Sequence, residues 1–231
     1  MDDIFSDTVR NRKYLNILLL FVTMTLIITS NTIVISVLFY LTMLKDNQIN
    51  SLTSNPSNRN FALLVIDLQN DFIDPKGSLP IPQTKSNLQS LENAKNKIQR
   101  YRENNNTIMF TRDTHFDNDP EFEIFGRHCI FGTWGWELIS DIASRDIIIN
   151  KPRYDSFISS QLLNFLNTYN IGELEIIGAV GEICVNYVAV GAWMRGFKGS
   201  IDLSSVVWFS EANQNFFIEN LQNITNIEIN Y

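Results

Sequence analysis

The sequence predicts an α/β domain built as three layers, in which a mostly parallel six-stranded sheet is covered by helices on both faces. Two observations predict this class. Short apolar runs alternate with longer amphipathic stretches over about 170 residues, from Phe61 to the end of the chain, which is typical of strands joined by helices. The same stretch holds no internal repeat and no low-complexity tract. We therefore treat residues 61–231 as one domain.

Six short apolar runs are the predicted strands of this sheet. They are FALLVID (61–67), TIMFT (107–111), DIIIN (146–150), LEIIGAV (174–180), SIDLSS (200–205) and NIEIN (226–230). Between them, amphipathic stretches at 91–101, 162–166, 185–193 and 216–221 predict the helices. Ligands of such sheets bind at the carboxyl ends of the strands, near the point where the strand order reverses. The residues that follow each strand are therefore the candidates for a site.

The N-terminal quarter of the chain has a different composition. From Tyr14 to Leu44 there is no Asp, Glu, Lys, Arg or His, and this run is longer than the roughly 20 apolar residues that cross a bilayer. It predicts a transmembrane anchor at 14–44, after a tail at 1–13 and before an Asn- and Ser-rich linker at 45–60. We expect the anchor to be retained, because a signal-peptide core has only about 7 to 15 residues. The polar break at 30–32 leaves a re-entrant hairpin of two short arms as the alternative to one tilted span.

Charge bears on membrane orientation and on partners. Arg10, Arg12 and Lys13 precede the anchor and only Lys45 closely follows it, so the positive-inside tendency places the N-terminus in the cytoplasm. The net charge is −7, and no cluster of basic residues follows the anchor, which argues against a nucleic-acid partner. We expect a small-molecule substrate.

Cys184 lies where the hydrophobic period changes from that of a strand to that of a helix. Gly178 and Gly181 give the intervening turn its backbone freedom, and the cysteine is expected in the first turn of the helix. Unpaired N–H groups and the helix dipole favour a thiolate there, so Cys184 is a candidate nucleophile. The alternative is a small buried apolar residue, which is the usual state of a free cysteine. The chain has two cysteines, too few for a disulfide framework.

Other reactive side chains follow the remaining strands. Asp67 ends the first predicted strand, and Lys151 follows the third. Asp113 and His115 follow the second strand at i and i+2, so both can point the same way and share one metal ion, with His128 reaching in from the next loop. The alternative is that these are ordinary polar residues of loops.

Five segments, in this order and at these spacings, resemble the isochorismatase-like cysteine hydrolases, the superfamily that includes the nicotinamidases. They are LLVIDLQNDFIDPKGSL, TRDTH, HCIFGTWGWEL, KPRYDSF and GAVGEICVNYVAVGA, and the resemblance covers 61–231 but not the anchor. It implies a catalytic trio of Asp67, Lys151 and Cys184. It further implies an oxyanion hole formed by the backbone N–H groups of Val180 and Cys184, with a cis peptide between Ala179 and Val180.

The resemblance also implies a metal site and an assembly. Asp113, His115 and His128 match the residues that hold a divalent ion, commonly zinc, which orients the ring nitrogen of nicotinamide. Cys129 matches a packed loop cysteine rather than a metal ligand. The family often associates, so a homo-oligomer is possible. Candidate walls of the substrate pocket are aromatic residues near strand ends, namely Phe72, Phe125, Trp134 and Tyr154.

Several positions depart from the family's pattern and bear on the substrate. Glu182, Val188 and Gly191 stand where the family often has Asp or Asn, Thr and Asp, and 203–205 stand where an Asp often follows the fifth strand. The expected function is hydrolysis of a small, nicotinamide-like carboxamide through a thioester on Cys184. The alternatives are an isochorismate-type vinyl-ether hydrolase, which does not need the cysteine, and an inactive membrane-anchored binding protein on the same fold.

Overall fold

A computed structural model of the chain describes residues 60–139 and 141–231. The predicted tail and anchor, and the linker up to residue 59, lie outside these residues. In the described part of the chain, no helix is both long enough and apolar enough to cross a membrane. Asn60, which we assigned to the linker, is the first residue of a strand, and its backbone N–H donates to the carbonyl of Asn170 at 2.9 Å.

The sheet has six strands, all paired in parallel, in the order β3-β2-β1-β4-β5-β6. The strands are β1 (Asn60–Ile66), β2 (Thr107–Asp113), β3 (Ile147–Lys151), β4 (Ile171–Ala179), β5 (Lys198–Val207) and β6 (Glu228–Asn230). The chain runs outward from β1 through β2 to β3, and then returns to place β4 on the other side of β1. The order therefore reverses between β1 and β4, where a crevice is expected at the carboxyl ends of the strands.

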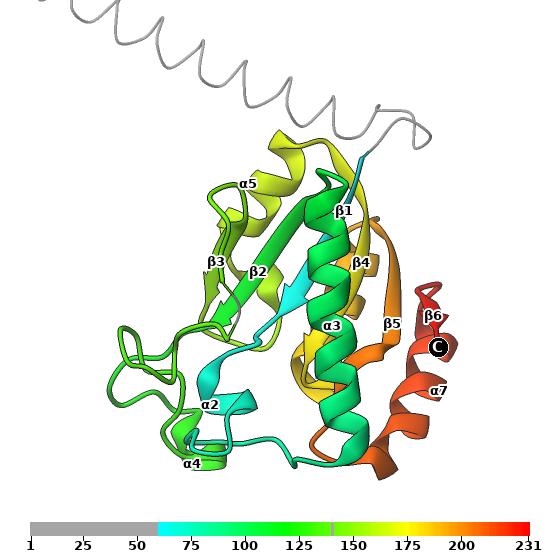
Figure 1. Ribbon diagram of the computed structural model, residues 1–231. Coiled ribbons are helices and arrows are strands. Elements are labelled where there is room, and N and C mark those ends of the chain that lie inside the picture. Colours follow the sequence, from blue (N-terminus) through cyan, green and yellow to red (C-terminus); the bar gives the residue numbers. More distant parts are fainter. Residues whose placement is uncertain (1–59, 140) are drawn as a thin grey trace, which may run out of the picture. The chain divides into compact units, whose positions relative to one another are not determined.

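Helices cover both faces of the sheet, as predicted (Figure 1). One face carries α3 (Lys85–Glu103), and the other carries α5 (Ser160–Thr168), α6 (Asn186–Met194) and α7 (Gln214–Ile224). The short helices α2 (Asn70–Ile73) and α4 (Phe122–Phe125) lie at the carboxyl end of the sheet (Figure 1). Single 3-10 turns precede α5 at Ser156–Ile158 and α7 at Glu211–Asn213.

Two apolar cores lie on either side of the sheet. Leu64 and Ile66 of β1 pack with α5, α6 and α7, whereas Leu63 and Val65 pack with α2 and α3. This alternation is that of a central strand buried on both faces, and it explains why β1 reads as a continuous apolar run.

Helix α3 begins six residues before the predicted start at Leu91. Its first turn is capped by Thr84, whose hydroxyl accepts from the backbone N–H of Asn87 at 3.1 Å. The residues that α3 buries are Asn87, Ser90, Ala94 and Ile98. The first three residues of the helix, KSN, are polar, and its first two buried positions are also polar, so the apolar period before Leu91 is weak.

The turn that holds Cys184 differs from the prediction. A π-helical turn at Gly181–Val185 precedes α6, so the cysteine lies before this helix rather than in its first turn. The backbone N–H of Val185 donates to the carbonyl of Val180, five residues back, at 3.2 Å. The peptide bond between Ala179 and Val180 is cis, as predicted.

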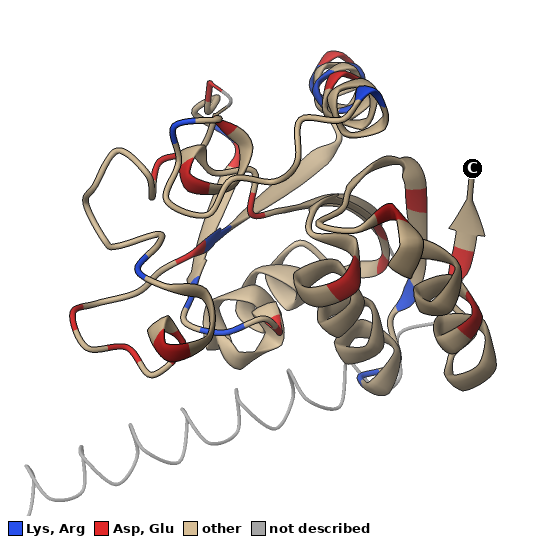
Figure 2. Ribbon diagram, turned by 90° about the horizontal axis from the view of Figure 1, so that it is seen from below, with Lys and Arg blue, Asp and Glu red and all other residues tan. Residues whose placement is uncertain are grey.

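Charged residues of both signs are interspersed over the described elements. Figure 2 looks from below the view of Figure 1 and shows acidic and basic residues scattered among helices and loops. No continuous basic face is visible in this view of the described residues.

Candidate active site

Four side chains that end or follow neighbouring strands meet at the carboxyl end of the sheet. Lys151 is central: its Nζ lies 2.7 Å from Oδ2 of Asp67, 3.2 Å from Oδ1 of Asp113 and 3.7 Å from Sγ of Cys184. Asp113 and Lys151 are paired residues at the ends of β2 and β3, so the register of these strands brings them together. All four are buried. The structure thus brings the predicted Asp, Lys and Cys into one cluster.

Thr111, which was not predicted as a site residue, holds the Asp67 side chain. Its hydroxyl donates to Oδ1 of Asp67 at 2.6 Å and accepts from the backbone N–H of Asp67 at 3.2 Å. Asp67 has a φ of 46°, in the left-handed region that aspartate tolerates better than most residues. Thr111 lies inside β2, and no pattern marks a polar residue within an apolar run as part of a site.

Burial and mutual charge shift the pKa values of this cluster. Burial by itself would lower the pKa of Lys151, but Asp113 and Asp67 raise it well above its usual value. Burial raises the pKa of Asp67, against the opposing effect of Lys151. For Asp113, burial would also raise the pKa, but Lys151 and the two histidines hold it well below the usual value. The cluster therefore carries a firmly protonated lysine beside a carboxylate of raised basicity.

The Cys184 thiol is not the low-pKa thiolate expected at a helix N-terminus. Burial raises its pKa well above the usual value, and the opposing effect of Lys151 does not reverse this direction. Burial therefore favours the thiol form over the thiolate, and Asp67 is the basic group of its cluster. Cys129 is fully buried in the core on the α3 side, and its backbone N–H donates to Asp71 at 2.7 Å, which agrees with a packed loop cysteine.

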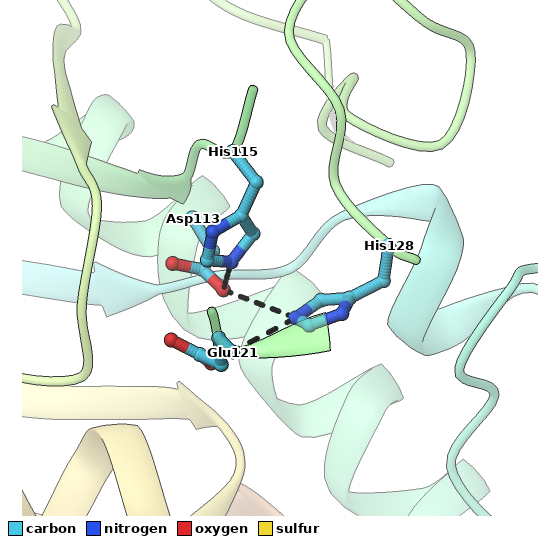
Figure 3. Close-up of side chains that lie close together, drawn as sticks. All are labelled: Asp113, His115, Glu121 and His128. Carbon is cyan, nitrogen blue, oxygen red and sulfur yellow. Dashed lines mark hydrogen bonds and ion pairs between the residues drawn. The ribbon is translucent and has the colours of Figure 1, made fainter. Parts of the chain in front are cut away.

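A second cluster of ligand-type side chains lies beside the first. Asp113, His115, Glu121 and His128 are buried, and one ligand atom from each lies within 4.8 Å of the others. Figure 3 shows their rings and carboxylates turned toward one another. Oδ2 of Asp113 is 2.9 Å from Nε2 of His115 and 3.5 Å from Nε2 of His128, which is 3.9 Å from Oε1 of Glu121. Glu121 was not predicted from the sequence, because it lies in an irregular loop before α4.

The donor set of this second cluster fits a divalent metal ion. Oε2 of Glu121 is buried without a hydrogen-bond partner in the described protein, so a buried anionic atom is left unsatisfied. Nδ1 of His128 lies 2.8 Å from the carbonyl oxygen of Gly126, and the other ring nitrogen faces the cluster. Burial would lower the pKa of His115, but Asp113 and Asp119 raise it to about 9, because their negative charges favour a cation at this place. Imidazole nitrogens with carboxylate oxygens are a common zinc donor set.

A largely apolar pocket opens at both clusters. It is lined by Phe72, Leu79, Asp113, Glu121, Phe125, His128, Tyr154, Ala179, Val180, Ile183, Cys184 and Phe209. Three of the four predicted aromatic walls, Phe72, Phe125 and Tyr154, therefore line it. Trp134 does not: its side chain is 54% exposed and borders a separate hollow with Lys76 and Arg127. Trp134 lies in an irregular loop, where sequence position does not determine the direction of a side chain.

Comparison with known proteins assigns the chain to a protein family. The Isochorismatase domain model matches residues 61–229, which is most of the chain. The chain belongs to the isochorismatase family. This family and its fold are those expected from the five sequence segments.

Two solved structures and one relative by sequence show which proteins the chain is similar to. A nicotinamidase/pyrazinamidase from Bacillus subtilis is 27% identical, with a TM-score of 0.68 over 74% of this chain and 100% of that one. A pyrazinamidase from Pyrococcus horikoshii, crystallised in complex with zinc, is 26% identical, with a TM-score of 0.68 over 74% of this chain and 99% of that one. A probable inactive nicotinamidase from Arabidopsis thaliana is 30% identical over 58% of this chain and 73% of its own length.

Proposed function

We propose that the domain hydrolyses the C–N bond of a small neutral carboxamide through a thioester on Cys184, and that nicotinamide is the leading substrate. The observation that carries this proposal is the contact of Lys151 with both Asp67 and Cys184, at 2.7 and 3.7 Å, beside a pocket into which Cys184 faces. Hydrolases of this family include amidases, and the two solved structures named above are a nicotinamidase/pyrazinamidase and a pyrazinamidase.

In the acylation step, Sγ of Cys184 forms a bond to the amide carbonyl carbon while its proton passes to Asp67. The raised pKa of Asp67 suits it as this acceptor, and the ammonium of Lys151 stabilises the sulfur as it loses its proton. The backbone N–H groups of Val180 and Cys184 are assigned to the oxyanion of the tetrahedral intermediate. The C–N bond then breaks, and Asp67 returns the proton to the departing nitrogen, which leaves as ammonia.

In the deacylation step, water adds to the thioester carbon and Asp67 takes a proton from it. The C–S bond breaks, the thiolate recovers its proton from Asp67, and the carboxylic acid leaves. Asp113, His115, Glu121 and His128 would hold a divalent ion, which supplies a Lewis-acid site for a polar atom of the substrate such as a ring nitrogen.

The lining of the pocket favours a neutral substrate. Among the described residues that line it, none is Lys or Arg, whereas Asp113 and Glu121 are acidic. Isochorismate carries two carboxylates. The proposed metal ion would pair with one of them, but no Lys or Arg among the described lining residues would pair with the other, which would be desolvated at a cost. Apolar and aromatic walls instead suit a planar, uncharged ring.

Ammonia release from a small panel of amides tests the proposal. The panel is nicotinamide, pyrazinamide, benzamide and the anionic amide succinamate, each with the native chain and with the Cys184→Ala variant. We expect turnover of at least one neutral aromatic amide, little turnover of succinamate, and a loss of at least about a thousandfold on removal of the nucleophile. Full turnover of isochorismate by Cys184→Ala would instead establish the vinyl-ether reaction.

Alkylation by iodoacetamide distinguishes an active enzyme from an inactive binding protein on the same fold. The second possibility is worth testing because one relative is a probable inactive nicotinamidase. Cys184 faces the pocket beside Lys151, whereas Cys129 is fully buried. We expect Cys184 to be modified much faster than Cys129. Equally slow modification of both, together with no turnover across the panel, would favour the inactive binding protein.

A further inference from the structure

We propose that Asp119 and Arg153 form an outer layer of the metal site, in which Asp119 positions two of the four ligands and Arg153 holds Asp119 in place. This inference rests on the proposed metal site of the amide hydrolase. It concerns how firmly the chain binds the ion, which can be measured without measuring hydrolysis.

The first contact of Asp119 is with His115. Oδ2 of Asp119 lies 3.0 Å from Nδ1 of His115, at ion-pair distance but outside hydrogen-bond geometry, and Nε2 of the same ring faces Asp113. The His115 side chain is fully buried, and that of Asp119 is only 12% exposed. A metal-binding histidine commonly presents its second nitrogen to a carboxylate, which fixes the ring orientation and makes the metal-facing nitrogen more basic.

The second contact of Asp119 is with the backbone of Glu121. Oδ1 accepts from the N–H of Glu121 at 2.9 Å, a local turn that fixes the start of the segment carrying this ligand. One carboxylate therefore uses one oxygen for His115 and the other for Glu121. Among the described residues outside the four-residue metal cluster, no other carboxylate contacts both His115 and Glu121.

Arg153 completes the arrangement from a different part of the chain. It follows β3 by two residues, and its guanidinium lies 3.0 Å from Oδ2 of Asp119. Since Lys151 ends β3 inside the catalytic cluster, this ion pair connects the loop that carries the metal ligands with the strand that carries the catalytic lysine. The pair is partly shielded, at 39% and 12% side-chain exposure, so solvent weakens it less than an open surface pair.

The same loop provides a matched control. Asp117 pairs with Arg127 at 2.6 Å, but the two side chains are 74% and 58% exposed. The pair has the same charges and the same kind of loop, and its carboxylate contacts none of the four ligands in the interactions of the described chain. A general effect of loop charge would be equal for both aspartates, whereas an effect of positioning would be specific to Asp119.

The test is the dissociation constant for Zn²⁺, measured on the full chain by competition with a chromophoric chelator. Asp119→Asn keeps the shape and should raise this constant about tenfold, whereas Asp119→Ala also frees the Glu121 backbone and should raise it toward about a hundredfold. Asp117→Asn and Asp117→Ala should stay within about threefold of the native chain. Arg153→Gln should weaken Zn²⁺ binding less than Asp119→Asn does, and Arg153→Lys should weaken it less than Arg153→Gln. When either Arg153 change is combined with Asp119→Ala, the double variant should bind Zn²⁺ as Asp119→Ala does alone.

Two further measurements make the outcome specific. The visible spectrum of bound Co²⁺ should change in Asp119→Asn, because the orientation of a ligand changes. Thermal unfolding of the metal-free variants should match that of the metal-free native chain. The inference is overturned if Asp119→Asn binds Zn²⁺ within about threefold of the native chain, if Asp117→Asn loses as much affinity, or if the native chain takes up no divalent ion. Loss of Zn²⁺ affinity in a chain that hydrolyses no amide would support the inference and refute the proposed function.

Discussion

At the scale of single residues, the site depends on how the Asp67 carboxylate is held. Its charge is buried, and its two oxygens have different partners: Lys151 contacts Oδ2 and the Thr111 hydroxyl donates to Oδ1. The hydrogen bond from Thr111 favours the ionised carboxylate, which opposes the effect of burial on the pKa. A hydroxyl inside an apolar strand therefore contributes, together with Lys151, to how readily the proposed base accepts a proton.

Replacement of Thr111 by valine tests this role. The two side chains have nearly the same shape, but valine leaves Oδ1 without its donor, and a hydrogen bond to a charged group contributes about 1.5 to 3 kcal/mol. We expect kcat/KM for the best amide to fall about 10- to 100-fold. Because the pKa of Asp67 should rise further and the reaction needs the ionised form, the acidic limb of the pH profile should move to higher pH.

The matched control is Thr111→Ser, which keeps the hydroxyl and should retain most of the activity with an unchanged acidic limb. If Thr111→Ser loses as much activity as Thr111→Val, loss of the hydroxyl alone does not explain the effect and the proposed role of the hydrogen bond is not supported. An acidic limb that moves to lower pH in Thr111→Val would contradict the assignment of Asp67 as the base.

At the scale of elements, the distance between β1 and β4 fixes where the proposed base and the proposed nucleophile meet. Gly178 lies near the end of β4 with a φ of 118°, and a Cβ at this position would approach the carbonyl oxygen of Ile66 to 2.2 Å. Ile66 is the last residue of β1 and directly precedes Asp67. A side chain at position 178 would thus push apart the two strand ends that carry Asp67 and the Cys184 turn.

Gly178→Ala should therefore cost both stability and activity. The unfavourable backbone conformation and the backbone clash together should lower the free energy of unfolding by at least about 2 kcal/mol. Gly196→Ala is the matched control, since this glycine also has a positive φ, of 78°, but nothing lies within 4 Å of its Cβ position. That change should cost about 1 kcal/mol and leave turnover unaffected. Urea unfolding with a parallel amide assay measures both, and equal costs at the two glycines would show that the close approach is unimportant.

At the scale of the whole molecule, the sequence predicts those parts of the site that follow from regular structure. Asp67, Asp113 and Lys151 each end an apolar run, and parallel strands bring such ends to one edge, so their meeting was predictable. Glu121 and Asp119 lie in an irregular loop, where no period indicates which side chains point inward. Trp134 was wrongly expected in the pocket for the same reason. The raised pKa of Cys184 was also missed, because it depends on burial by packing from several elements.

The N-terminal quarter remains a prediction from composition. Residues 14–44 lie outside the part of the chain that the structure describes, and the family match begins at residue 61. A run without charged residues of this length is expected to partition into a bilayer, whereas the described domain has two apolar cores of its own. We therefore propose that the hydrolase domain is tethered to a membrane through residues 14–44, and that its catalysis does not depend on the tether.

Fractionation of cells that express the full chain tests the tether. The chain should remain in the membrane pellet after a sodium carbonate wash at high pH, and a variant lacking residues 1–59 should move to the supernatant. The truncated variant should keep its turnover of the best amide within about threefold, because a domain with its own core folds alone. Asn60 is retained in it, since this residue pairs β1 with the end of the α5 segment.

The control is Ile27→Arg in the full chain, which places a charge near the middle of the predicted span at a cost of about 2.5 to 3.5 kcal/mol and should weaken retention in the pellet. A full chain that the carbonate wash releases, or a truncated domain that aggregates, would show that residues 14–44 pack against protein instead of lipid.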